Sequence, residues 1–239
     1  AGTWATVTAA NPYNVDFTVP AGLASGDYDV WVHNGDGGAY GWSEPVTLTV
    51  RDPIVWSGAT FDVTDYGADG SDNVDDTAAI QAALTAAASV DMATVYFPAG
   101  TYLGSDRLTP AGRVRWLGDG MDATTIQAID GYDQTYFIFG SPSLFQMEGM
   151  TLEANRENAV DLKPPLRMRH GGDLRFFDFR LHGLGTSSDL HDNDSITVQG
   201  CEWISGGTFL GNNKQVFFSD TDVYGCYRWV YYTDPPSTG

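Results

Sequence analysis

The stretch that decides the fold is Phe61-Asp-Val-Thr-Asp-Tyr-Gly-Ala-Asp-Gly-Ser-Asp-Asn-Val-Asp-Asp-Thr-Ala-Ala-Ile-Gln, residues 61–81. It is typical of an extended strand, a turn rich in Asp and Gly, and then a helix. Asp75, Asp76 and Thr77 stand where the first helical amides need acceptors and where negative charge suits the helix dipole. One apolar stripe at positions i, i+3, i+4, i+7 and i+8 predicts the buried side of the helix: Ile80, Ala83, Leu84, Ala87 and Ala88.

Two further segments follow the predicted helix. Ala93-Thr-Val-Tyr-Phe-Pro-Ala-Gly-Thr-Tyr is typical of a short strand that ends in Pro-x-Gly, and Val114-Arg-Trp-Leu-Gly-Asp-Gly follows it. In this order the segments resemble the opening of the pectate-lyase-like, rhamnogalacturonase/epimerase-type parallel β-helices. The resemblance is carried by these residues: Asp65-Tyr66-Gly67-Ala68, Asp75-Asp76-Thr77, Ala79-Ile80-Gln81, Val95-Tyr96-Phe97-Pro98, Gly100, Tyr102 and Gly118-Asp119-Gly120. One departure is Asp69-Gly70-Ser71-Asp72, where the family has Gly-Asp-Gly.

The resemblance covers about residues 60–126 and implies a fold more than an active site. It implies an all-β chain with a right-handed parallel β-helix that begins at an N-terminal capping helix. We therefore expect residues 53–239 to form the N-terminal part of such a domain. The remainder of a longer β-helix is an expected partner, because members of the family usually carry more coils than fit here.

Residues 1–52 predict a separate, small antiparallel β-module. Apolar residues alternate along three segments, which end at Val19, Val32 and Val50, and turns rich in Gly, Pro and Asp separate the segments. We expect three or four strands. An immunoglobulin-like sandwich usually needs about seven strands, so the module would be a reduced version.

Composition excludes some function classes. The 239 residues carry a formal net charge of −19, which argues against a nucleic-acid partner. No apolar run approaches the ~20 residues of a membrane span. The sequence shows no signal peptide and does not begin with Met, so we expect a mature secreted form or an excised fragment. The two cysteines, Cys201 and Cys226, do not decide the redox compartment.

A repeat can be argued without the family. Four segments share apolar residues at positions 1, 3, 6 and 8, as in Leu174, Phe176, Phe179 and Leu181, and they start at residues 145, 174, 196 and 216. The spacing predicts a strand, a tight turn that uses one extra residue, and a second strand. Recurrence every 20 to 30 residues predicts stacked coils whose equivalent positions form columns. Cys201 then falls in an inward column.

The outward columns supply the candidate catalytic residues. One column contains Thr151, Arg180, Glu202 and Asp222, and the other contains Glu153, His182, Ile204 and Tyr224. Stacked carboxylates at Glu202 and Asp222 would suit glycoside hydrolysis, since one pKa of such a pair should rise as a general acid requires. The alternative to a catalytic pair is a solvent-exposed column of charges that Arg180 partly neutralises. A lyase would instead use Arg180 with His182 or Tyr224.

Basic residues and an Asp-rich loop complete the candidates. Half of the 12 Lys and Arg residues lie between residues 156 and 180, which predicts a local positive patch that could bind a uronate polymer. Arg169 and Arg175 are its candidate substrate-binding residues, and Tyr224 on the outward column is the third. Pairing of the basic residues with nearby Asp residues is the alternative. The run His191-Asp-Asn-Asp-Ser could offer oxygens to calcium, although it lacks the pattern of an EF-hand and a plain Asx-turn explains it better. We expect no other cofactor.

The resemblance implies a secreted carbohydrate-active enzyme, either a glycoside hydrolase or a polysaccharide lyase, whose partner is a polysaccharide that could contain uronate. The rival is a non-catalytic glycan-binding or attachment module of a larger surface or tailspike-like protein. Fold alone does not decide between them.

Overall fold

The computed structural model describes residues 2–35, 38–132, 136–153 and 165–224, and it divides the chain into two compact units, residues 1–55 and 56–239. The first unit pairs β1 with β2 and β3 with β4, both antiparallel, as the alternating pattern predicted. Its elements are β1 (Thr6–Asn11), β2 (Asn14–Thr18), β3 (Gly26–Val30), the short 3-10 helix η1 (Ala39–Gly41) and β4 (Val46–Val50). An immunoglobulin-like identity stays a prediction.

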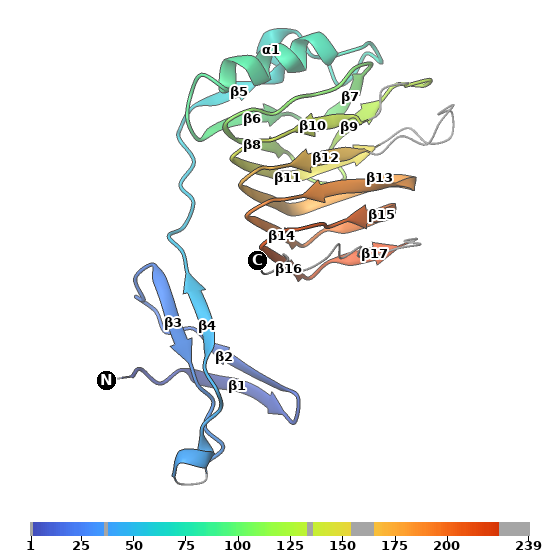
Figure 1. The fold of residues 1–239 in the computed structure, drawn as a ribbon. Coiled ribbons are helices and arrows are strands. Elements are labelled where there is room, and N and C mark those ends of the chain that lie inside the picture. Colours follow the sequence, from blue (N-terminus) through green and yellow to red (C-terminus); the bar gives the residue numbers. More distant parts are fainter. Residues whose placement is uncertain (1, 36–37, 133–135, 154–164, 225–239) are drawn as a thin grey trace, which may run out of the picture. The chain divides into compact units, whose positions relative to one another are not determined.

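The second unit is a right-handed parallel β-helix (Figure 1). It begins with β5 (Thr60–Asp62), the 3-10 helix η2 (Val63–Tyr66), α1 (Thr77–Ala87), β6 (Ala93–Phe97), β7 (Gly100–Gly104), β8 (Arg113–Gly118) and β9 (Thr124–Ala128). It continues with β10 (Ile138–Gly140), β11 (Leu144–Glu153), β12 (Leu166–Arg169), β13 (Asp173–His191), β14 (Ser195–Gln199), β15 (Glu202–Phe209), β16 (Gln215–Ser219) and β17 (Asp222–Tyr224). In the described part of the chain, no helix has the length and apolarity needed to cross a bilayer.

Successive coils stack their strands into three parallel faces. The first face runs from β5 through β6, β8, the start of β11, the start of β13 and β14 to β16. The second runs from β7 through β9, the end of β11, the middle of β13 and β15 to β17. The third contains β10, β12, the end of β13 and the end of β15. One long strand, β13, therefore contributes to all three faces.

Helix α1 covers the first coil (Figure 1). Its predicted apolar stripe is buried at Ile80, Ala83, Leu84 and Ala87, whereas Ala88 is exposed because the helix ends at Ala87. The two acids before the helix have different roles. Asp75 accepts hydrogen bonds from the Thr77 amide and from Ser105, which caps the first turn. Asp76 instead accepts the amides of Asp69 and Leu103. The cap is thereby tied to the first coil.

The extra residue of each predicted tight turn has a left-handed backbone. It is Gly149 in β11, with φ 63°, and Asp178 in β13, with φ 45°. At Gly149 an added Cβ would lie 2.8 Å from the Gly118 carbonyl oxygen, so this position requires glycine for space as well as for conformation. The bend turns the chain from the first face to the second while both strands keep their inward columns.

The inward columns form the core. Phe145, Met147, Met150 and Leu152 of β11 are 0% exposed, and Cys201 joins the core at 2%. In β16, Val216 and Phe218 occupy inward positions but are 37% and 44% exposed, because β16 and β17 form the last coil in the part of the chain that the structure describes. Burial raises the pKa of Cys201 to about 11, as expected for a thiol in an apolar environment.

Candidate functional site

The register of the second face agrees with the expected columns. Thr151 pairs with Arg180, Arg180 with Glu202, and Glu202 with Asp222. His182 lies in the parallel column, where its Nδ1 contacts the Glu153 carboxylate. The structure therefore brings Arg180, His182, Glu202 and Asp222 to one face. The backbone of Tyr224 is opposite Ile204 in β17, but its side chain lies outside the described residues.

The electrostatics of this column do not suit a general acid at Glu202. The Nε and Nη2 atoms of Arg180 donate to the two Glu202 carboxylate oxygens at 2.7 and 3.2 Å, and its Nη1 donates to Asp122 at 2.8 Å. These bonds lower the pKa of Glu202 and raise that of Arg180. The pKa of Glu202 is therefore lowered by its bonds with Arg180, and the expectation that one carboxylate of the Glu202–Asp222 pair has a raised pKa stays a prediction.

Of the expected positive patch, the structure describes Arg167, Arg169, Arg175 and Arg180, and it divides these four arginines among three faces. Arg175 pairs with Gln146 and Thr197 on the first face, Arg180 lies on the second face, and Arg169 lies on the third beside His191. Five residues separate Arg175 from Arg180, but the bend at Asp178 falls between them. Arg156 and Lys163, which also belonged to the expected patch, lie outside the described residues.

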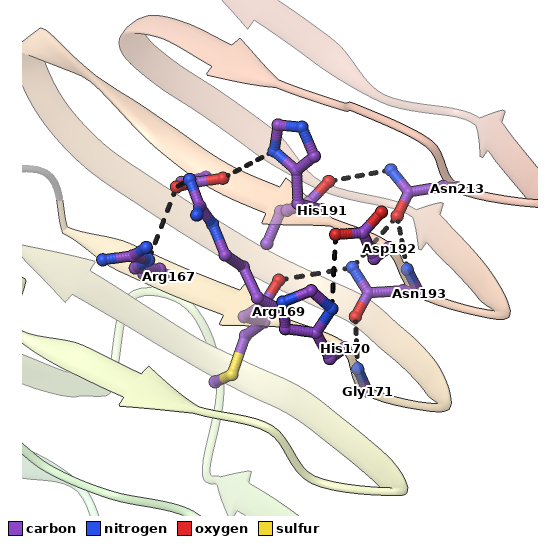
Figure 2. A network of polar contacts seen from close by, with 11 residues as sticks. Arg167, Arg169, His170, Gly171, His191, Asp192, Asn193 and Asn213 are labelled. Atoms are coloured by element: carbon purple, nitrogen blue, oxygen red, sulfur yellow. Dashed lines mark hydrogen bonds and ion pairs between the residues drawn. The ribbon is translucent and has the colours of Figure 1, made fainter. Parts of the chain in front are cut away.

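The third face carries a second cluster of charges, which centres on Asp189. Figure 2 labels three of its partners, Arg167, Arg169 and His191. Asp189 is only 7% exposed. Its carboxylate contacts the Arg167 Nε at 3.5 Å and the His191 Nδ1 at 3.0 Å, and it accepts a hydrogen bond from Arg169. The bond with Asp189 raises the pKa of Arg169. One buried carboxylate is thus surrounded by two guanidinium groups and an imidazole, contributed by β12 and β13.

Aromatic rings extend this cluster toward earlier coils. The guanidinium carbon of Arg167 lies 4.9 Å from the ring centre of Tyr136 and 5.5 Å from that of Phe139. The two rings stack with their centres 6.2 Å apart. Arg107 lies over Phe139 at 5.6 Å. Arginine above an aromatic face is a favourable cation–π arrangement, and it fixes the guanidinium planes on this face.

The run His191-Asp-Asn-Asp-Ser has a structural explanation that needs no calcium. The Asn193 carboxamide accepts the Gly171 amide and donates to the carbonyl of Met168 and to the side-chain oxygen of Asn213. Asn193 therefore links three successive coils at the turn beside the Asp189 cluster (Figure 2). In the described ranges, no three His, Cys, Asp or Glu side chains are grouped as metal ligands. A calcium requirement stays a prediction.

Glycine makes room for the imidazole of this cluster. A Cβ at Gly211, on the next coil, would lie 1.9 Å from the His191 Nε2. The Nε2 edge of His191 therefore faces Gly211, while its Nδ1 contacts Asp189.

Sequence reasoning singled out Arg169 but did not place Asp189, His191 and Arg167 together. Residues 167, 169, 189 and 191 do alternate in two strand-like segments, and this signal could have indicated the pairing. Arg107 and Phe139 carried no comparable signal.

Comparisons with known proteins agree with this architecture. The family described as "Rhamnogalacturonase A/epimerase, pectate lyase-like" matches residues 60–163. Mannuronan C5-epimerase AlgE2 of Azotobacter vinelandii is 40% identical over 111 residues, which are 41% of this chain and 11% of that protein. Alginate lyase 7 of the same organism is 40% identical over 108 residues, covering 42% and 11%. The solved A-module of mannuronan C-5 epimerase AlgE4 from this organism aligns with a TM-score of 0.58 and 26% identity, over 71% of this chain and 53% of the module. The chain thus spans about a tenth of the first two relatives and about half of the module.

Proposed function

Because the chain is a pectate-lyase-like parallel β-helix protein, we propose that it is carbohydrate-active and acts on a uronate-containing polysaccharide outside the cell. The names of the relatives support this substrate class, since they include several mannuronan C5-epimerases and an alginate lyase. The remainder of a longer β-helix is part of the proposal as a partner, because the matched relatives are much longer than this chain.

The observation that carries the proposal is the excess of positive charge around Asp189. In a chain of net charge −19, an anionic polymer needs a local cationic site to bind. Arg167 and Arg169 provide it, and they share the Asp189 carboxylate as an ion-pair partner. Guanidinium groups bind carboxylates through two parallel hydrogen bonds. We assign the uronate carboxylate to these two arginines.

The same geometry suits removal of the proton at C5 of the bound uronate. We assign the base to His191, whose Nδ1 contacts Asp189 and whose Nε2 faces Gly211. The arginines stabilise the negative charge that then develops on the substrate carboxylate. If the C4–O bond breaks, the C4–C5 double bond forms, the leaving oxygen takes up the proton that His191 removed from C5, and the polymer is cleaved with an unsaturated end. If a proton instead returns to the opposite face of C5, the product is an epimer and the polymer stays intact.

Two other assignments compete on the second face. A hydrolase would use Glu202 and Asp222, and a lyase would use Arg180 with His182 or Tyr224. The lowered pKa of Glu202 disfavours the first, and the occupation of Arg180 by two carboxylates disfavours the second. The non-catalytic alternative, a glycan-attachment module, would bind the polymer on the third face without converting it.

The experiment is incubation of the protein with polymannuronate and polygalacturonate. Three readouts are followed: ultraviolet absorbance of unsaturated ends, reducing ends, and the proton NMR signals of C5 epimers. We expect conversion without new saturated ends, and we expect its loss in His191→Gln. The matched control is His170→Gln, an exposed histidine that pairs with Asp192 on the adjoining turn. Saturated products that vanish in Glu202→Gln would overturn the assignment in favour of hydrolysis.

Two arms cover the remaining alternatives. Retention of the polymer without conversion would establish an attachment module instead of an enzyme. Loss of conversion in a chelator, with recovery after calcium is added, would support a calcium requirement.

A further inference from the structure

Arg107 is a charged group that the proposed chemistry leaves unused. It is partly buried, its Nε has no hydrogen-bond partner, and in the described part of the chain no carboxylate lies within ion-pair distance of its guanidinium. Its partner is the ring of Phe139. In a protein with 31 acidic residues, an arginine held by an aromatic ring alone is suited to an anion from outside.

Arg107 lies two coils away from the proposed carboxylate site. The residue after it, Leu108, is bridged in parallel with Ile138, and Ile138 pairs with Leu166. Phe139 belongs to the middle coil and lies within 5.6 Å of both Arg107 and Arg167. The third face thus presents a cation, an aromatic ring and a second cation on three successive coils, with Arg107 two positions along the strand from the column of Phe139 and Arg167.

The ladder formed by Arg107, Phe139 and Arg167 has a spacing that agrees with that of an extended polyuronate. Neighbouring coils are ~4.8 Å apart, close to the length of one sugar in an extended 1,4-linked chain. In the two-fold form of such a chain, every second sugar presents its carboxylate on the same side. Carboxylates of the first and third sugars would then match the coils of Arg107 and Arg167. The intervening sugar would lie over the exposed part of Phe139, which is 39% exposed.

We propose that Arg107 and Phe139 form a second subsite, so that the protein binds at least three consecutive uronates that run along the axis of the coils. This inference rests on the proposed function, because it takes the Arg167 and Arg169 position as the first carboxylate site. It adds a requirement on chain length and on the spacing of charges.

The test is calorimetric binding of oligomannuronates of two and four sugars to the full chain. We expect Arg107→Gln to weaken binding of the tetramer about tenfold, as loss of a charge-assisted contact should, and to leave the dimer unchanged. Arg113→Gln is the matched control. It removes the same charge from an arginine that pairs with Asp91 on the first face, and we expect no change for either ligand.

Two further variants keep the test sharp. Phe139→Leu retains an apolar side chain but removes the ring that contacts both Arg107 and Arg167, so it should weaken binding of the dimer as well as of the tetramer. Arg107→Lys keeps the charge and should restore part of the affinity. Circular dichroism verifies that each variant folds.

The outcomes separate the two proposals. If the wild-type chain binds the tetramer no better than the dimer, or if Arg107→Gln affects both ligands equally, the ladder is wrong and the proposed function stands. If the wild-type chain binds neither ligand, both are overturned.

Discussion

Asn193 offers a test of how the coils are held together. Its side chain is 1% exposed and makes three hydrogen bonds, with the Gly171 amide at 3.2 Å, the Met168 carbonyl at 3.3 Å and the Asn213 side chain at 3.0 Å. A typical intramolecular hydrogen bond contributes about 1 kcal/mol net, and an orphaned buried partner costs more. We therefore expect Asn193→Ala to lower the free energy of unfolding by about 3 kcal/mol.

A double-mutant cycle isolates the contact between coils. Asn213 accepts both the amide and the carboxamide of Asn193, and it donates to the Leu190 carbonyl at 2.8 Å. Because the two side chains share a bond, the double variant should lose about 1 kcal/mol less than the sum of the single losses.

Urea denaturation followed by circular dichroism measures these changes. The control is Asn14→Ala, an exposed asparagine in the first unit that bonds Asp16, which should change stability by less than about 0.5 kcal/mol. A loss below about 1 kcal/mol for Asn193→Ala, or strictly additive losses, would refute the view that this side chain carries contacts between coils.

Three other predictions concern single residues. Gly211→Ala should displace the imidazole of His191 and reduce conversion about 100-fold if His191 is the base. The control is Gly58→Ala, whose added Cβ meets nothing within 4 Å and should leave conversion unchanged. Equal activity in both variants would contradict the assignment of the base. The pKa of Glu202 is lowered in the folded protein, so its ion pair should stabilise the fold at neutral pH and lose that effect as the pH falls below about 4. Glu202→Gln should flatten this part of the pH–stability curve, by less than about 1 kcal/mol because the pair is partly exposed, and an unchanged curve would argue against the pair. In a Cys226→Ser background, Cys201 should resist iodoacetamide at pH 8 until the protein is denatured, because burial raises its pKa to about 11; rapid labelling of the native protein would show that this thiol is accessible.

Much of the β-helix could be predicted because its coils repeat a simple pattern. The apolar spacing predicted that Phe145, Leu174, Ile196 and Val216 stack, and each is paired with the next in the register. The pattern works because the bend always uses one residue, so inward and outward positions stay in phase across it.

The third face was harder to predict because its strands are short and follow connections of unequal length. Only four residues form β12, and no fixed spacing relates Arg167 to Asp189 from coil to coil. The expected basic patch is divided for a related reason: Arg167 and Arg169 share the third face, but a bend places Arg175 and Arg180 on two other faces. Charge clusters in such a fold are better sought between coils than along the chain.

The columns on the second face have a consequence for how such proteins change. Thr151, Arg180, Glu202 and Asp222 share one backbone geometry, yet they comprise a hydroxyl, a cation and two anions. Each outward position has a fixed place on the stacked coils, so its side chain can be exchanged while the inward side chains keep the core packed. Evolution, or an engineer, could therefore compose a new recognition surface by exchanging one outward residue at a time.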